Sequence, residues 1–72
     1  MRRMKTSVLQ KEKTALQKRR QELNLTQKQV ADKIGLRETA YARYERGEVL
    51  PSVAMALRIA AALDATVEKL FL

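Results

Sequence analysis

A chain of 72 residues is long enough for one small domain, and such a domain buries only about 60% of the surface that its unfolded form exposes. Cysteine and histidine are both absent, which excludes disulfides and the usual zinc ligands and removes the most common catalytic side chains. We therefore expect no enzyme, no metal site and no cofactor, and the formal net charge of +7 favours a polyanionic partner.

The positive charge is concentrated at the start of the chain. Residues 1–20 carry eight Lys or Arg and one Glu, which gives +7, whereas residues 21–72 carry seven residues of each sign, which gives zero. We predict a basic arm over residues 1–12, either disordered or extending the first helix, followed by one domain over 13–72. Clustered Lys and Arg suit phosphates, but a solubilising tail or an artificial extension would have the same composition.

No apolar run approaches the ~20 residues of a membrane span. The basic opening is not followed by the apolar stretch of a signal peptide. We therefore expect no membrane partner and a cytoplasmic location, associated with the nucleoid.

The first two predicted helices have clear ends. Residues 13–23, KTALQKRRQEL, are strong helix formers, and Asn24 is suited to the left-handed stop that follows a helix. Thr26 and Gln29 have the spacing of a capping box and predict the start of a second helix. That helix ends at Gly35, because the residue after a helix often needs a positive φ.

A third helix is predicted over about 37–45, before Gly47. On a helical wheel we expect Ala40, Tyr41 and Tyr44 to face the core. The opposite side carries Glu38, Thr39, Ala42, Arg43 and Arg46. These residue types suit base edges in the major groove, which is about 12 Å wide and admits a helix: Arg binds guanine, Thr contacts thymine, and Glu accepts from cytosine. The alternative is a face that is merely solvated.

Pro51 and Ser52 predict the start of a fourth helix, which Asp64 ends, and Thr66 then caps a short fifth helix. On the fourth helix we expect the core face to consist of Val53, Ala56, Leu57, Ala60 and Leu63. The remaining sides carry Ala54, Met55, Ile59, Ala61 and Ala62. The sequence therefore predicts an all-α fold, a compact bundle of five helices.

The outer side of the fourth helix is largely apolar, and a small domain cannot bury both sides of a surface helix. We therefore expect a homodimer that covers this side. The predicted dimer interface consists of Met55, Arg58, Ala62, Phe71 and Leu72. A helix that is rich in alanine for its helix propensity alone is the alternative.

Three stretches resemble a known family in order and spacing: RRQELNLTQKQVADKIGL, YARYERGEVLPS and ALRIAAALDATVEKLF. The family is the phage-repressor (Cro and CI) type of helix-turn-helix protein, also called the xenobiotic-response-element type. The resemblance covers roughly residues 14–71. It implies a lambda-repressor-like DNA-binding domain that contains a helix-turn-helix and commonly dimerises through its C-terminal region.

The resemblance implies a role for several residues. Gln27 matches a glutamine that bonds a phosphate and braces the recognition helix. The expected DNA-binding residues are Gln27, Lys28, Arg37, Glu38, Thr39, Arg43 and Arg46, of which Glu38 and Thr39 match the first base-contacting positions and Arg37 and Arg43 match contacts to phosphate or a further base. Arg20 and Glu45 match a pair that forms a buried salt bridge in relatives.

The chain departs from the family pattern at three positions. Arg37 stands where the family usually has Ser or Thr, so the third helix loses a standard N-cap worth ~1 kcal/mol. Tyr41 replaces Ile or Val, and Glu38 replaces Gln or Arg. Glu38 either recognises cytosine or pairs with an Arg.

These features predict a dimeric, sequence-specific regulator of transcription that binds double-stranded DNA at a near-palindromic operator. Repression is the expected output, and activation through contact with polymerase is the variant. The alternative function is a protein-interaction module, an antitoxin that masks a toxin or a bridging factor, which would use the apolar side of the fourth helix and the terminal EKLFL.

Overall fold

The computed structural model describes residues 13–72, which form five α-helices and no strand. The helices are α2 (Ala15–Glu22), α3 (Gln27–Ile34), α4 (Glu38–Glu45), α5 (Val53–Ala62) and α6 (Val67–Phe71). The all-α, five-helix prediction is confirmed for this part of the chain. The predicted basic arm, residues 1–12, lies outside the described residues.

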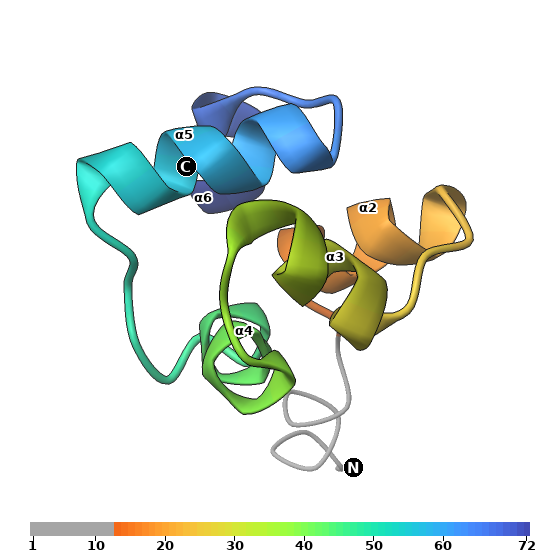
Figure 1. The fold of residues 1–72 in the computed structure, drawn as a ribbon. Helices are drawn as coiled ribbons and strands as arrows, with labels where there is room; N and C mark the ends of the chain where they lie inside the picture. The colour runs from red at the N-terminus through yellow and green to blue at the C-terminus, as the bar shows by residue number, and fades with distance from the viewer. Residues whose placement is uncertain (1–12) are drawn as a thin grey trace, which may run out of the picture.

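The helices pack as a bundle in which α3 is central. It packs against both α4 and α5, while α6 packs against α2 and α5. Figure 1 shows α4 at one end of the bundle and the α5–α6 pair at the other. Among the helices of residues 13–72, α4 packs mainly against α3, and its other side carries exposed side chains.

Four of the five helices begin at a side-chain N-cap. Thr14, Thr26, Ser52 and Thr66 each accept a hydrogen bond from the backbone N–H three residues later, at 3.0–3.2 Å. The Thr26 cap is a full capping box, as predicted, because the Thr26 N–H also donates to Gln29 Oε1 at 2.8 Å. Each cap satisfies a backbone donor that has no partner within its helix.

The N-terminus of α4 is the exception. Arg37 occupies the N-cap position with φ −74° and ψ 152°, and its side chain makes no capping hydrogen bond. Glu38 lies in the first turn, where a carboxylate interacts favourably with the positive end of the helix dipole. Helix α4 therefore begins with weaker local stabilisation than its neighbours.

The predicted helix stops are also present. Asn24 has φ +58° and Gly35 has φ +76°, both in the left-handed region. A Cβ at residue 35 would meet no atom within 4 Å, so glycine is favoured there by its φ rather than by crowding.

The core is built from the inner faces of all five helices. Its buried members are Leu16, Val30, Ala31, Ile34, Tyr41, Ile59, Ala60, Leu63 and Leu70. Among these, Tyr41 and Ile59 are the largest fully buried side chains.

The predicted core face of α5 is wrong at three positions. Val53 is 78% exposed and Leu57 is 58% exposed, whereas Ile59, which was expected outside, is fully buried. The actual buried stripe is Ala56, Ile59, Ala60 and Leu63. Because α5 is apolar on nearly all sides, two different stripes fit the same helical spacing, and only packing against α3 and α6 selects one of them.

The predicted inner face of α4 is also partly wrong. Tyr41 is buried as expected, but Ala42 is buried rather than outward-facing. Ala40 and Tyr44, which were expected to face the core, are only half-buried. The buried stripe is centred on Tyr41, Ala42 and Glu45, because the charged Glu45 side chain lies inside the domain.

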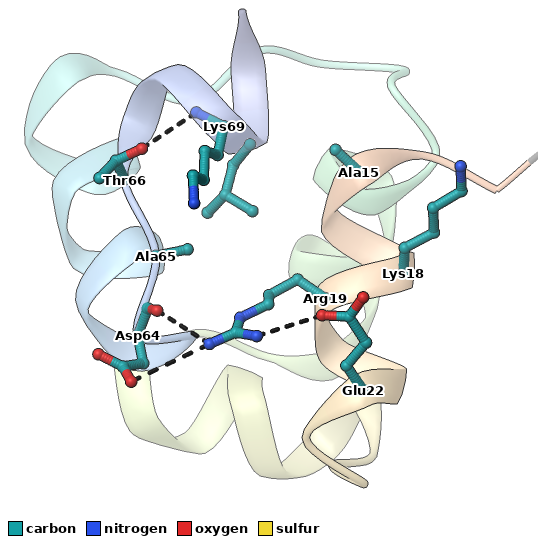
Figure 2. A pocket seen from close by; sticks show the side chains of 9 residues that line it. Ala15, Lys18, Arg19, Glu22, Asp64, Ala65, Thr66 and Lys69 are labelled. Carbon is teal, nitrogen blue, oxygen red and sulfur yellow. Dashed lines mark hydrogen bonds and ion pairs between the residues drawn. The ribbon is translucent and has the colours of Figure 1, made fainter.

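Arg19 connects α2 to the turn after α5 (Figure 2). Its Nε donates to the Leu63 carbonyl at 2.8 Å, its Nη2 donates to the Asp64 carbonyl at 3.0 Å, and its Nη1 lies 3.1 Å from Glu22 Oε1. These bonds satisfy carbonyl groups at the end of α5, where Asp64 reverses the chain with φ +51°. Arg19 lines the hollow between α2 and α6, and its hydrogen bonds across that hollow connect α2 to the turn after α5.

None of the helices in residues 13–72 has the length and apolar character needed to cross a membrane.

Replacing Ile59 by Ala should lower the free energy of unfolding by ~2–5 kcal/mol, because it leaves a cavity in the core. The matched variant, Leu57→Ala, removes a similar side chain from the exposed side of the same helix and should change stability by less than ~1 kcal/mol. Denaturant unfolding, extrapolated to low protein concentration, measures the free energy of unfolding of both variants. A larger loss of stability for Leu57→Ala than for Ile59→Ala would instead support the sequence prediction, in which Leu57 faces the core and Ile59 does not.

Candidate nucleic-acid interface

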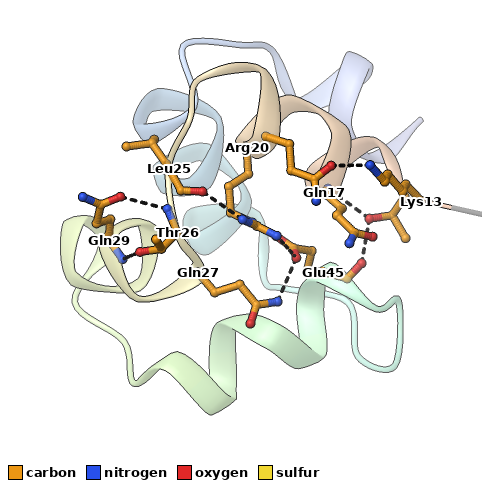
Figure 3. Close-up of polar contacts among 10 residues, drawn as sticks. Lys13, Gln17, Arg20, Leu25, Thr26, Gln27, Gln29 and Glu45 are labelled. Carbon is orange, nitrogen blue, oxygen red and sulfur yellow. Dashed lines mark hydrogen bonds and ion pairs between the residues drawn. The ribbon is translucent and has the colours of Figure 1, made fainter.

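A buried carboxylate fixes the end of α4 against the rest of the domain (Figure 3). Glu45 is 2% exposed, and Arg20 of α2 binds both of its oxygens, with Nε 2.7 Å from Oε2 and Nη2 3.0 Å from Oε1. Gln27, the first residue of α3, donates from Nε2 to Glu45 Oε1 at 2.8 Å. Three helices therefore meet at one carboxylate.

Two further hydrogen bonds join this cluster to the backbone. Arg20 Nη1 donates to the Leu25 carbonyl at 2.8 Å, and Thr14 Oγ1 donates to the Glu45 carbonyl at 2.7 Å. The planar guanidinium thus contacts a carboxylate and a carbonyl at once, a geometry that Lys could not provide. These contacts hold α2, α3 and α4 in one arrangement.

The charges in the cluster stabilise each other. Burial alone would raise the pKa of Glu45, but the hydrogen bonds from Arg20 and Gln27 bring that pKa below its usual value. The hydrogen bond to Glu45 raises the pKa of Arg20 further above its already high value. Glu45 is therefore a carboxylate at neutral pH despite its burial.

The Tyr41 hydroxyl lies beside this cluster without a hydrogen-bond partner among residues 13–72. Burial raises the pKa of Tyr41, and the nearby Glu45 charge raises it further. The phenol is thus neutral, and its hydroxyl is near the carboxylate but outside hydrogen-bonding geometry.

With Tyr41, Ala42 and Glu45 turned inward, α4 presents a different set of side chains to solvent. Thr39, Arg43 and Arg46 are exposed, the two arginine side chains at 59% and 55%. Ala40 and Tyr44 border a shallow hollow that Arg43 and Val49 complete. The outer face of α4 therefore carries the polar side chain of Thr39 and the basic side chains of Arg43 and Arg46.

The remaining predicted contact residues lie at the N-termini of α3 and α4. Arg37 and Glu38 are exposed at the start of α4, and Glu38 forms no ion pair with any residue in 13–72. Lys28 is exposed in the first turn of α3, with its Nζ 3.7 Å from Asp32 Oδ2. Gln27 is half-buried, with its side-chain amide turned toward Glu45.

Sequence reasoning missed Glu48, which lies beside the outer face of α4. Its carboxylate is 2.6 Å from Arg46 Nε and 3.7 Å from Arg43 Nε. The signal was the sequence YERGE: a glycine after a helix turns the chain back, so that the next residue lies over the last turn.

The five residues predicted for the dimer interface do not form one surface. Met55, Ala62 and Phe71 are half-buried and pack against the domain's own core. Arg58 and Ala62 lie in a hollow beside the end of α3, whereas Phe71 and Leu72 lie in another with Leu50 and Val53. The strongly exposed large apolar residues are Leu50, Val53, Leu57 and Leu72, at 58–94%.

Comparison with known proteins agrees with this architecture. A helix-turn-helix family model matches residues 16–70. The chain belongs to this helix-turn-helix family. The resemblance to its phage-repressor type is confirmed, since the chain is also 42% identical over 58 residues to the cryptic phage CTXphi transcriptional repressor RstR of Vibrio cholerae serotype O1.

The match to RstR covers 81% of this chain and 52% of the relative, so the chain spans about half the length of that protein. No solved structure matches the chain. In the family's terms, α3 and α4 are the two helices of the helix-turn-helix, and α4 is the recognition helix.

Replacing Arg20 by Gln should destabilise the domain by ~3–5 kcal/mol, because it leaves the Glu45 carboxylate buried with an incomplete set of partners. For a domain of this size that corresponds to a fall in melting temperature of ~4–8 °C per kcal/mol. The matched variant Lys18→Gln removes an exposed positive charge from the same helix and should have little effect. Equal losses in thermal unfolding for the two variants would mean that the buried pair does not hold the helices together.

The lowered pKa of Glu45 also predicts how stability depends on pH. Because its pKa is lower in the folded chain than the ordinary value of about 4.3, its contribution is present above about pH 4.3 and is lost as the pH falls through the folded pKa. Unfolding free energies measured from neutral to acidic pH should therefore fall less steeply for Glu45→Gln than for the unaltered chain. The control is Glu68→Gln, which removes an exposed carboxylate from α6; a slope unchanged by Glu45→Gln would refute the assignment.

Proposed function

We propose that this chain is a sequence-specific regulator of transcription that binds double-stranded DNA, a role that its family membership favours over that of an enzyme. The observation that carries the proposal is the orientation of α4. Glu45 is held inward by Arg20 and Gln27, whereas Thr39 and Arg43 are exposed in the part of the chain that the structure describes, residues 13–72. The relative RstR is a transcriptional repressor, which supports repression as the output.

In this proposal α4 enters the major groove and its outer face contacts base edges. Arg43 is suited to the two acceptors of guanine, and Thr39 to a thymine methyl or a base acceptor. Glu38, at the start of the helix, is suited to the amino group of cytosine. Ala40 and the exposed edge of Tyr44 would lie close to the bases as well, and they join the predicted contact set.

Phosphate contacts would position the helix. The first backbone amides of α3, at Gln27 and Lys28, have no acceptor within the helix and are favourable partners for an anion. The Gln27 side chain would act mainly as the brace of α4, since its amide donates to Glu45. Lys28 and Arg37 are exposed and would add charge near the backbone of the DNA.

Binding as a homodimer would give the affinity and specificity that one small module lacks. A two-fold dimer places two recognition helices about 34 Å apart and requires a near-palindromic site. The exposed apolar residues Leu50, Val53, Leu57 and Leu72 support a dimer surface at the start of α5 and the end of α6. This surface replaces the set predicted from the sequence, of which only Phe71 and Leu72 line the same hollow.

The same apolar surface supports a second candidate, a protein-interaction module in which it binds a toxin, polymerase or another partner. The two candidates differ in what α4 does, because only the first requires its outer face to touch DNA.

Selection from a random duplex pool, with a salt titration and the stoichiometry measured on the selected site, tests the proposal. We expect a near-palindromic site, two chains per duplex, and an affinity that falls with a slope of about 0.9 in log K per log salt for each phosphate contacted. Arg43→Ala should weaken binding by ~1–3 kcal/mol and relax the preference at one base position.

Lys18→Ala is the matched control, because Lys18 is exposed in the hollow between α2 and α6, away from α4. The absence of any preferred site would refute the regulator and leave the interaction module. A uniform loss across all sequences for Arg43→Ala would make Arg43 a phosphate contact.

A further inference from the structure

Glu48 is held beside the recognition helix by the backbone that ends it. The Gly47 N–H donates to the Tyr44 carbonyl and the Glu48 N–H to the Arg43 carbonyl, both at 3.0 Å. Gly47 has φ +78°. This is the bonding pattern of a Schellman motif, and it turns the chain back so that residue 48 lies over the last turn of α4.

In this position the Glu48 carboxylate contacts both arginines of the outer face. Oε2 lies 2.6 Å from Arg46 Nε, and Oε1 lies 3.7 Å from Arg43 Nε. The hydrogen bond from Arg46 lowers the pKa of Glu48, so the carboxylate is charged at neutral pH. All three side chains are about half exposed, and ion pairs of this kind contribute little to stability.

We propose that Glu48 is a specificity-determining residue, which limits the contact of Arg43 and Arg46 with DNA phosphates and so makes binding depend on base edges. The inference rests on the proposed function, since it concerns the same face of α4. Glu48 acts through the two arginines and is a positioning residue rather than a base contact.

Charge supplies the first reason. A phosphate that approaches Arg46 meets a guanidinium already paired with a carboxylate, and it brings its own negative charge close to that carboxylate. Like charges at such distances repel each other. Base acceptors such as guanine N7 and O6 carry no net charge, so Glu48 penalises them less than it penalises a phosphate.

Geometry supplies the second reason. Both carboxylate contacts are made through Nε, and the terminal nitrogens of Arg43 and Arg46 form no hydrogen bond to residues 13–72. Each guanidinium therefore keeps donors free for a pair of base acceptors. The carboxylate restricts the orientation of the arginines without using the donors that recognition needs.

The test is the Glu48→Gln variant, measured on the selected duplex and on a duplex of unrelated sequence over a range of salt. Affinity for the unrelated duplex should rise, and the salt slope on it should steepen by about 0.9 for each arginine that gains a phosphate. With that slope, each added phosphate contact strengthens binding roughly eightfold more at 0.1 M salt than at 1 M salt. Affinity for the selected duplex should change less, so that the ratio between the two falls.

Glu22→Gln is the matched control, because it makes the same change in net charge and breaks a comparable pair, Arg19 with Glu22 at 3.1 Å, on the side of α2 that faces Asp64. It should leave both the slope and the ratio unchanged. In an Arg46→Gln background, Glu48→Gln should steepen the salt slope less than it does in the unaltered chain, because one of the released arginines is gone.

If the unaltered chain shows a preferred site but Glu48→Gln behaves like Glu22→Gln, the role of Glu48 is refuted and the proposed function stands. A loss of affinity for both duplexes in Glu48→Gln would refute it in the same way. If the unaltered chain binds no duplex, the proposed function itself fails.

Discussion

The buried contact between Arg20, Gln27 and Glu45 is the constraint on which the working surface depends. Helix α4 has eight residues, and isolated helices of that length are marginal in water. Its N-cap side chain makes no capping hydrogen bond, so tertiary contacts must hold the helix. Glu45 provides them at the C-terminal end and Tyr41 in the middle. Together they fix the rotation of the helix about its axis, and that rotation decides which side chains meet solvent.

This arrangement divides the helix into two functions. The inward residues Tyr41, Ala42 and Glu45 determine how α4 is seated, while Thr39, Arg43 and Arg46 have no part in the core. Side chains on the outer face can therefore change with little effect on the fold, which suits the proposed role of this surface in distinguishing DNA sequences. The exposed apolar residues at the start of α5 lie apart from this face, so that a dimer formed through them would leave α4 free.

Local signals in the sequence predicted the helix ends well, because a cap is decided by residues three positions apart. The Thr26–Gln29 capping box and the left-handed turns at Asn24 and Gly35 are where they were expected.

The inward faces were harder to predict. On α5 the stripes beginning at Val53 and at Ala56 have the same helical spacing, and only tertiary packing buries Ile59. On α4 the wheel placed Ala42 on the outer face, although the resemblance already implied a buried pair between Glu45 and Arg20. An inward Glu45 turns the neighbouring Ala42 inward as well. The position of Glu48 depends on the left-handed turn at Gly47, which a helical wheel does not represent.

The central claim, that the outer face of α4 contacts base edges in the major groove, is tested most directly by altering those edges. Single guanines of the selected site can be replaced by 7-deazaguanine, which retains base pairing but lacks the N7 acceptor. The unaltered chain should lose on the order of 1 kcal/mol at one guanine of each half-site, and Arg43→Ala should be insensitive at that same guanine. Equal losses for both proteins at every guanine, or no loss at any, would contradict the claim.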